Sequence, residues 1–111
     1  MPQKNHLADP ELLVLLALIR LGPEAYGVSI TREIELRGRR VFALGNVYAA
    51  LDRLQARGLV KSELGQSTAE RGGRAKRFYR ITAKGLREVR ATRASLIGLW
   101  QGVPALEGGW A

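Results

Sequence analysis

The chain of 111 residues has no cysteine, and its single histidine, His6, stands near the N-terminus. Without thiols it forms no disulfide, no thiolate metal site and no cysteine nucleophile. The sequence also lacks a glycine-rich phosphate loop after a strand, and Asp52 and Glu63 are isolated acids without a second carboxylate at a useful spacing. We therefore expect a protein that is not an enzyme and that has no metal site and no cofactor.

Long hydrophobic runs are missing as well. The longest covers residues 12–19 and has eight members, whereas a membrane-spanning helix needs about 20. The residues on either side of this run do not resemble a secretory signal. We expect a cytoplasmic protein with no membrane partner.

Acidic residues are scarce, with ten Asp and Glu against 18 Lys and Arg, which gives a net charge of +8. Residues 71–93 alone contain nine basic residues and a single acid, Glu88. This imbalance favours a polyanionic partner, nucleic acid first, because basic side chains that neutralise phosphates release counterions. The alternative is a solvated loop that only keeps the protein soluble.

Two helices are expected before residue 39. Asp9 and Pro10 form a helix start, and the apolar residues that follow surround the whole circumference of the helix. Such a helix must be covered on several sides. After a break at residues 22–24, a second helix is expected over residues 26–37, with Gly38 as its stop.

A third helix and a pair of strands are expected next. The helix covers residues 44–57 and ends at Gly58. Residues 59–64 and 76–81 are strand candidates, joined by a loop rich in glycine and polar residues. The three helices followed by this hairpin have the order of a winged helix.

A fourth helix is expected over residues 83–101, capped by Thr82, and Pro104 together with the glycines at 108 and 109 is expected to end ordered structure. The expected fold class is α+β and mostly helical: a winged helix-turn-helix with an added C-terminal dimerisation helix. We divide the chain into a DNA-binding domain, residues 1–82, and a dimerisation helix with its tail, residues 83–111.

The third helix is the candidate reader of base edges. Its face opposite the core carries small or polar side chains, among them Asn46, Ala49 and Arg53. Asn46 lies in the first turn, where it is suited equally to base contact and to N-terminal capping. Tyr48 likewise has two possible roles, phosphate contact through its hydroxyl or packing of its ring.

Four segments, residues 15–19, 25–30, 45–60 and 73–82, resemble the PadR family of transcriptional regulators. The strongest are the tyrosine-bearing third helix that runs into Arg-Gly-Leu-Val, and the Gly-Arg pair that runs into Phe-Tyr-Arg-Ile-Thr. The resemblance covers about residues 11–100. It implies a homodimer that represses genes from an inverted-repeat operator in double-stranded DNA and releases it when a signal such as a small molecule arrives.

The resemblance also implies which residues meet DNA. Gly45, Asn46 and Tyr48 match the DNA end of the recognition helix, and Arg74, Lys76 and Arg77 match the wing. Where the family often has Ser-Pro, this chain has Ala43 and Leu44, so Asn46 is available as a substitute cap. The complete expected DNA-binding set is Gly45, Asn46, Tyr48, Ala49, Arg53, Arg71, Arg74, Lys76 and Arg77.

The last helix carries an apolar stripe with nothing of its own to cover it, and its short length resembles the small subfamily with one dimerisation helix. A partner subunit is the natural cover, and the alternative is a helix that folds back on its own domain. The expected interface consists of Leu15, Ile19, Leu86, Val89, Leu96 and Trp100. A small apolar or aromatic effector is expected between the subunits beside Leu96 and Trp100, the alternative for Trp100 being interface packing.

Two other functions are compatible with a basic winged helix. An RNA-binding protein would present aromatic side chains for base stacking on its sheet, whereas the aromatic residues here fall at apolar pattern positions. A protein-interaction adaptor would not need the arginine-rich wing. Both are weaker interpretations than DNA binding.

Overall fold

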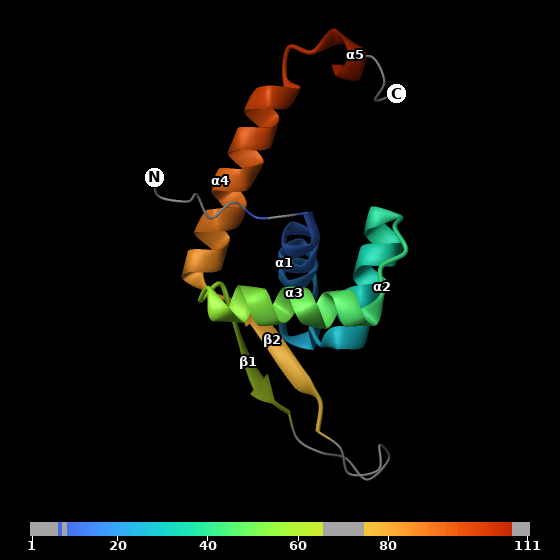
Figure 1. The fold of residues 1–111 in the computed structure, drawn as a ribbon, viewed down its shortest axis with the longest axis vertical. Coiled ribbons are helices and arrows are strands. Elements are labelled where there is room, and N and C mark those ends of the chain that lie inside the picture. The colour runs from blue at the N-terminus through green and yellow to red at the C-terminus, as the bar shows by residue number, and fades with distance from the viewer. Residues whose placement is uncertain (1–6, 8, 66–74, 108–111) are drawn as a thin grey trace.

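The computed structural model describes residues 7, 9–65 and 75–107. Their elements follow the expected order of three helices, two strands and a final long helix (Figure 1). The fold is a mostly helical winged helix-turn-helix, as the sequence predicts. Its elements are α1 (Asp9–Leu21), the 3-10 turn η1 (Gly22–Glu24), α2 (Gly27–Gly38), α3 (Leu44–Ala56), β1 (Val60–Leu64), β2 (Arg77–Ile81), α4 (Ala83–Trp100) and α5 (Pro104–Glu107).

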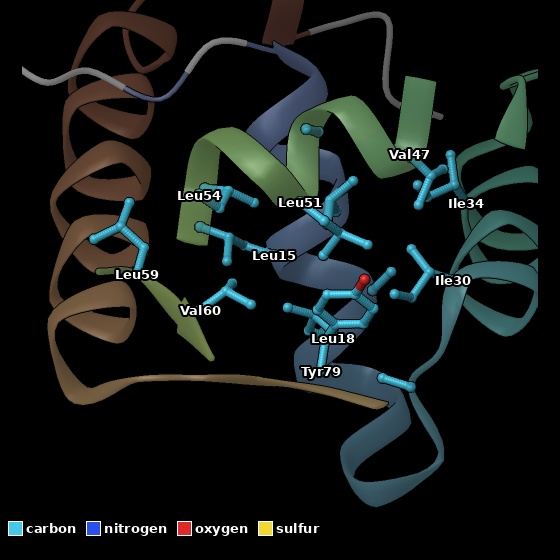
Figure 2. Close-up of a cluster of buried hydrophobic side chains, with 14 of the residues drawn as sticks. Leu15, Leu18, Ile30, Ile34, Val47, Leu51, Leu54, Leu59, Val60 and Tyr79 are labelled. Carbon is cyan, nitrogen blue, oxygen red and sulfur yellow. The ribbon is translucent and has the colours of Figure 1, made fainter. Parts of the chain in front are cut away.

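A single apolar core lies where α1, α2, α3 and the strands meet (Figure 2). Removal of each large aliphatic side chain from water contributes about 1.5–3 kcal/mol, before the entropic cost of ordering it. The spacing of the buried residues along α3 leaves its opposite face outside the core. The largest fully buried side chains are Leu15, Ile30, Leu51, Leu54, Leu59, Val14 and Val47.

The two strands form an antiparallel pair in which Val60 lies opposite Ile81 and Leu64 opposite Arg77. The chain between η1 and α2 pairs with the other edge of β2, because the Tyr79 N–H donates to the Ala25 carbonyl at 2.9 Å. This bond anchors the base of the wing to the helical domain.

Thr82 caps α4 as predicted, since its Oγ1 accepts the Gly85 N–H at 3.0 Å. Gly85 is needed there, because a Cβ atom would lie 2.4 Å from the Leu59 carbonyl oxygen. Beyond this anchored start, α4 extends away from the domain (Figure 1), and Gly85 and Val89 are its buried residues. No helix in the described ranges is long and apolar enough to cross a membrane.

Two expectations about where helices and ordered structure end differ from the structure. α2 ends one residue later than expected, with Gly38 as its last helical residue. Arg39, and not the glycine, adopts the left-handed conformation that follows the helix, with φ 57°. Of the residues expected to end ordered structure, Pro104 instead begins the short helix α5, and the glycines at 108 and 109 lie outside the described residues. Proline starts a helix readily, since its missing N–H has no partner in the first turn anyway.

Candidate nucleic-acid interface

The face of α3 that points away from the core carries small and polar side chains. Gly45, Asn46 and Ala49 are exposed, whereas Val47 and Ala50 on the other face of the helix are fully buried. A Cβ atom added to Gly45 would have no contact within 4 Å beyond its own stretch of helix. This end of α3 is open enough for the edge of a duplex groove to approach it.

Asn46 does not cap α3. The cap position is Ala43, which has no side-chain cap bond, and the Asn46 backbone N–H donates to the Ala43 carbonyl at 2.9 Å. The capping alternative is therefore wrong in this structure. Within the part of the chain that is described, the Asn46 side-chain amide is exposed and makes no capping hydrogen bond.

Tyr48 packs against the first residue of α2. A Cβ atom on Gly27 would lie 2.3 Å from the Tyr48 hydroxyl oxygen, so the glycine is what allows the ring to lie there. Tyr48 nevertheless stays 42% exposed. Of the two roles open for Tyr48, the structure supports packing and leaves phosphate contact as a proposal.

Arg53 points toward α1 rather than straight away from the domain. Its Nε donates to Oε2 of Glu11, whose side chain is only 7% exposed, while that of Arg53 is 53% exposed. The other Glu11 oxygen, Oε1, is buried with no hydrogen-bond partner among the described residues. Arg53 is thus a structural partner of a buried acid, which its place on the outer face of α3 did not reveal.

The described part of the wing is held by contacts that the sequence pattern did not predict. Lys76 places its Nζ 4.1 Å from the centre of the Tyr26 ring, a cation–π contact. The Ser62 hydroxyl oxygen accepts from Gln55 on α3 and from Arg77 on β2, each at 3.2 Å. Ser62 of β1 therefore links α3 to β2 at the base of the wing.

Arg71 and Arg74 fall outside the described residues, and their place in the interface remains a prediction.

Tyr79, directly before Arg80 on β2, is buried beneath α3. Burial raises the pKa of the Tyr79 phenol above its usual value of 10.0; nearby Tyr48 and Asp52 add to the rise, and Arg77 opposes it. Tyr79 is consequently a neutral core residue.

The expected dimer residues divide into two groups. Leu15 is fully buried and Val89 nearly so within their own chain, and both belong to the core cluster. Their inclusion in an intersubunit surface was wrong, because the all-round apolar character of α1 does not tell which side its own domain covers. Leu86 is half-buried, and the remaining expected residues are exposed, namely Ile19, Leu96 and Trp100. Leu16 and Leu99 are also exposed apolar residues, although neither is part of the interface expected from the sequence.

An open groove of about 750 Å³ lies between the end of α1, η1, the strands and the start of α4. Ile19 and Leu86 line it, together with Lys61 and Arg80. Neither Leu96 nor Trp100 lines this groove, so it is separate from the expected effector site. Among the described residues, no three His, Cys, Asp or Glu side chains gather as a metal site would require.

A family model, the PadR-like family of transcriptional regulators, matches residues 15–91. The chain belongs to this family. Similar solved structures include a PadR family transcriptional regulator from Eggerthella lenta, 30% identical with a TM-score of 0.69, covering 85% of this chain and 80% of that chain. No match was found among curated protein sequences.

Two further similar structures of transcriptional regulators are each 25% identical to this chain. A transcriptional regulator from Clostridium thermocellum has a TM-score of 0.69, with 81% of this chain and 82% of that chain covered. A PadR family regulator from hypervirulent Clostridium difficile has a TM-score of 0.67, with coverage of 83% and 91%. As a PadR-like protein, the chain is a transcriptional regulator and not an enzyme.

Proposed function

We propose that this PadR-like regulator binds double-stranded DNA as a homodimer at an inverted-repeat operator and represses transcription there. The observation that carries the proposal is the outward face of α3, which presents Gly45, Asn46 and Ala49 at one end of the helix. The wing lies beside this helix and is fixed to it through Ser62. Together α3 and the described part of the wing place an open helix face and exposed basic side chains in one domain.

Direct readout is assigned to the first turns of α3. Gly45 and Ala49 are small enough for the helix to approach the groove floor closely, and the Asn46 amide matches the donor and acceptor edge of adenine. The absence of a capping role supports this assignment, because the Asn46 amide has no competing bond in the described structure.

Affinity is assigned to the wing. Arg77 is exposed on β2, and Arg71 and Arg74 of the sequence add charge to the same hairpin. Guanidinium groups bind phosphates through paired hydrogen bonds, and each neutralised phosphate releases counterions. Lys76 contributes from its position over the Tyr26 ring.

The second subunit is assigned to the exposed apolar side chains of α1 and α4. Leu96, Leu99 and Trp100 lie on the part of α4 that extends beyond the domain, and Leu16 and Ile19 lie on α1. Residues of this kind, gathered on two helices, form the self-complementary interface of a twofold dimer. The dimer would carry two copies of α3, which matches the two halves of an inverted repeat.

We assign the release of the DNA operator to a small apolar or aromatic effector that binds between the subunits beside Leu96 and Trp100. Such a ligand must bind better to the arrangement that does not fit DNA, since equal affinity for both arrangements would shift nothing. Trp110→Phe leaves Trp100 as the single tryptophan, so we expect effector binding to change its fluorescence and to release bound DNA. A Trp100→Phe protein that responds equally through Trp110 would put the pocket elsewhere.

RNA binding receives no support from the sheet. Phe78 packs edge-on against Tyr26 with ring centres 5.6 Å apart, and Tyr79 is buried, so neither ring is free to stack on a base.

Sedimentation of the free and duplex-bound protein tests the proposed function. We expect a free species of about twice the chain mass of 12.2 kDa and a complex containing two chains for each operator duplex. A monomer at micromolar concentration, or a complex with one chain, would contradict the proposal.

A further inference from the structure

The turn between α2 and α3, residues 39–43, carries two exposed side chains, Arg39 and Val41, that are not packed into the core. Its sequence is Arg-Arg-Val-Phe-Ala, and it leads directly into the end of α3 where Gly45 and Asn46 are exposed. Figure 1 shows the turn on one side of α3 and the strands of the wing on the other. A duplex that meets the start of α3 would therefore have the wing on one flank and this turn on the other.

Two side chains of the turn are used by the fold. Arg40 forms an ion pair with Asp9 of α1, and Phe42 packs partly buried against the core. The turn is also tied to α2, because the Arg39 N–H donates to the Glu35 carbonyl at 3.1 Å. These contacts hold the turn in one shape and leave its other side chains pointing outward.

Arg39 has a backbone conformation that an arginine adopts at a cost. Its φ is 57°, and among the described residues it is the only non-glycine with a positive φ. Glycine suits this position better because the left-handed conformation crowds a Cβ atom, which glycine lacks, and asparagine offsets part of that cost by hydrogen-bonding to the nearby backbone. The neighbouring glycine, Gly38, lies inside the helix instead.

The Arg39 side chain is exposed and has no ion-pair partner in the described part of the chain, whereas Arg40 and Arg37 both pair with acids. Val41, two residues later, is 95% exposed. A strained position that carries an unpaired cation, next to an apolar side chain in water, is typical of a residue kept for contact with another molecule.

We propose that the α2–α3 turn is a second DNA-binding arm, in which Arg39 contacts a backbone phosphate and Val41 contacts the adjoining sugar. This inference rests on the proposed DNA-binding function and adds a contact flank opposite the wing. It assigns Arg39 to affinity rather than to sequence choice, because phosphate contacts are the same for every sequence.

The test compares wild type with Arg39→Gly, Arg39→Lys, Val41→Ser and Arg87→Gln, using fluorescence anisotropy of a labelled mixed-sequence duplex at salt concentrations from about 50 to 200 mM. Arg87 is a matched control, because it is an exposed basic residue on α4. Thermal unfolding of each variant is measured alongside.

We expect Arg39→Gly to have an unchanged or higher Tm, because the strain is relieved, and yet to bind the duplex about threefold or more weakly, with a salt slope lower by about one. Arg39→Lys should keep the slope, and Arg87→Gln should bind as wild type does. Val41→Ser should weaken binding without changing the slope, since it removes no charge.

An Arg39→Gly protein with wild-type affinity and slope overturns this proposal, whatever Val41→Ser does. An equal loss in Arg87→Gln also overturns it, because the effect would then be one of net charge. A wild-type protein that binds no duplex would instead contradict the proposed function itself.

Discussion

Arg53 on the recognition helix is bonded to Glu11 in the first turn of α1, 42 residues earlier in the chain. The Glu11 side chain is buried and the Arg53 side chain is half-exposed, so the ion pair lies at the edge of the contact between α1 and α3. Because α1 also carries exposed apolar residues of the proposed dimer interface, this pair links the proposed subunit contact to the helix that we propose reads DNA.

Replacing Arg53 with methionine should lower the free energy of unfolding by about 1–3 kcal/mol, since a buried carboxylate would lose its partner. Partial exposure of Arg53 keeps this below the cost for a fully buried pair. Urea denaturation measures the loss. The double variant Glu11→Leu with Arg53→Met should regain most of it, because no buried charge remains. Unchanged stability in Arg53→Met, with a loss only in DNA affinity, would make Arg53 a DNA contact and not a structural partner.

Gly27→Ala should destabilise the protein by about 1–3 kcal/mol, because the added methyl group overlaps the Tyr48 ring. The second change Tyr48→Ala should remove the overlap, so that the effects of the two substitutions are not additive. Gly45→Ala is the control: nothing lies within 4 Å of its Cβ position, and alanine favours a helix. If Gly27→Ala melts at the wild-type temperature, Tyr48 does not pack as described.

Asn46→Ala should leave the unfolding temperature unchanged and weaken binding to the operator by about 1–3 kcal/mol, with little effect on random duplex. Arg77→Ala should weaken binding to both duplexes and lower the salt slope by about one. Binding titrations at several salt concentrations measure both effects. A fall in melting temperature for Asn46→Ala would restore the capping role.

The order of elements could be predicted from the sequence because local signals determine it. Thr82 before α4, the glycine at position 58 after α3, and the apolar spacing along α3 all operate within a few residues. The strand predictions began one residue earlier than β1 and β2 do. By the same local logic Gly38 was expected to stop α2, but the left-handed position fell on Arg39.

The site could be predicted only in outline. Periodicity identifies the outer face of α3, but it gives no sign that Arg53 finds an acid 42 residues away. Likewise, Leu15 and Leu16 are equally apolar, and only the packing of α2 and α3 against α1 shows that the first is core and the second is surface. The hydroxyl of Ser62 joins α3 to β2 through tertiary contacts that no local pattern encodes.

Leu99→Asp should dissociate the proposed dimer while each chain stays folded, because Leu99 is 74% exposed in the single chain and an aspartate there would be buried against the partner. Leu36→Asp is a matched control, since Leu36 is 72% exposed but lies on α2. Sedimentation velocity and circular dichroism together distinguish dissociation from unfolding. Equal behaviour of the two variants would move the interface away from α4.

The most direct test of the account is selection of bound duplexes from a random-sequence pool by the purified wild-type protein. The account predicts an enriched inverted repeat whose half-site centres are about one helical turn apart, as two copies of α3 on a twofold axis require. Two chains should occupy each selected duplex, and Asn46→Ala should lose the preference for it. A pool that stays unenriched, or that yields a single unrepeated site bound by one chain, would contradict the account.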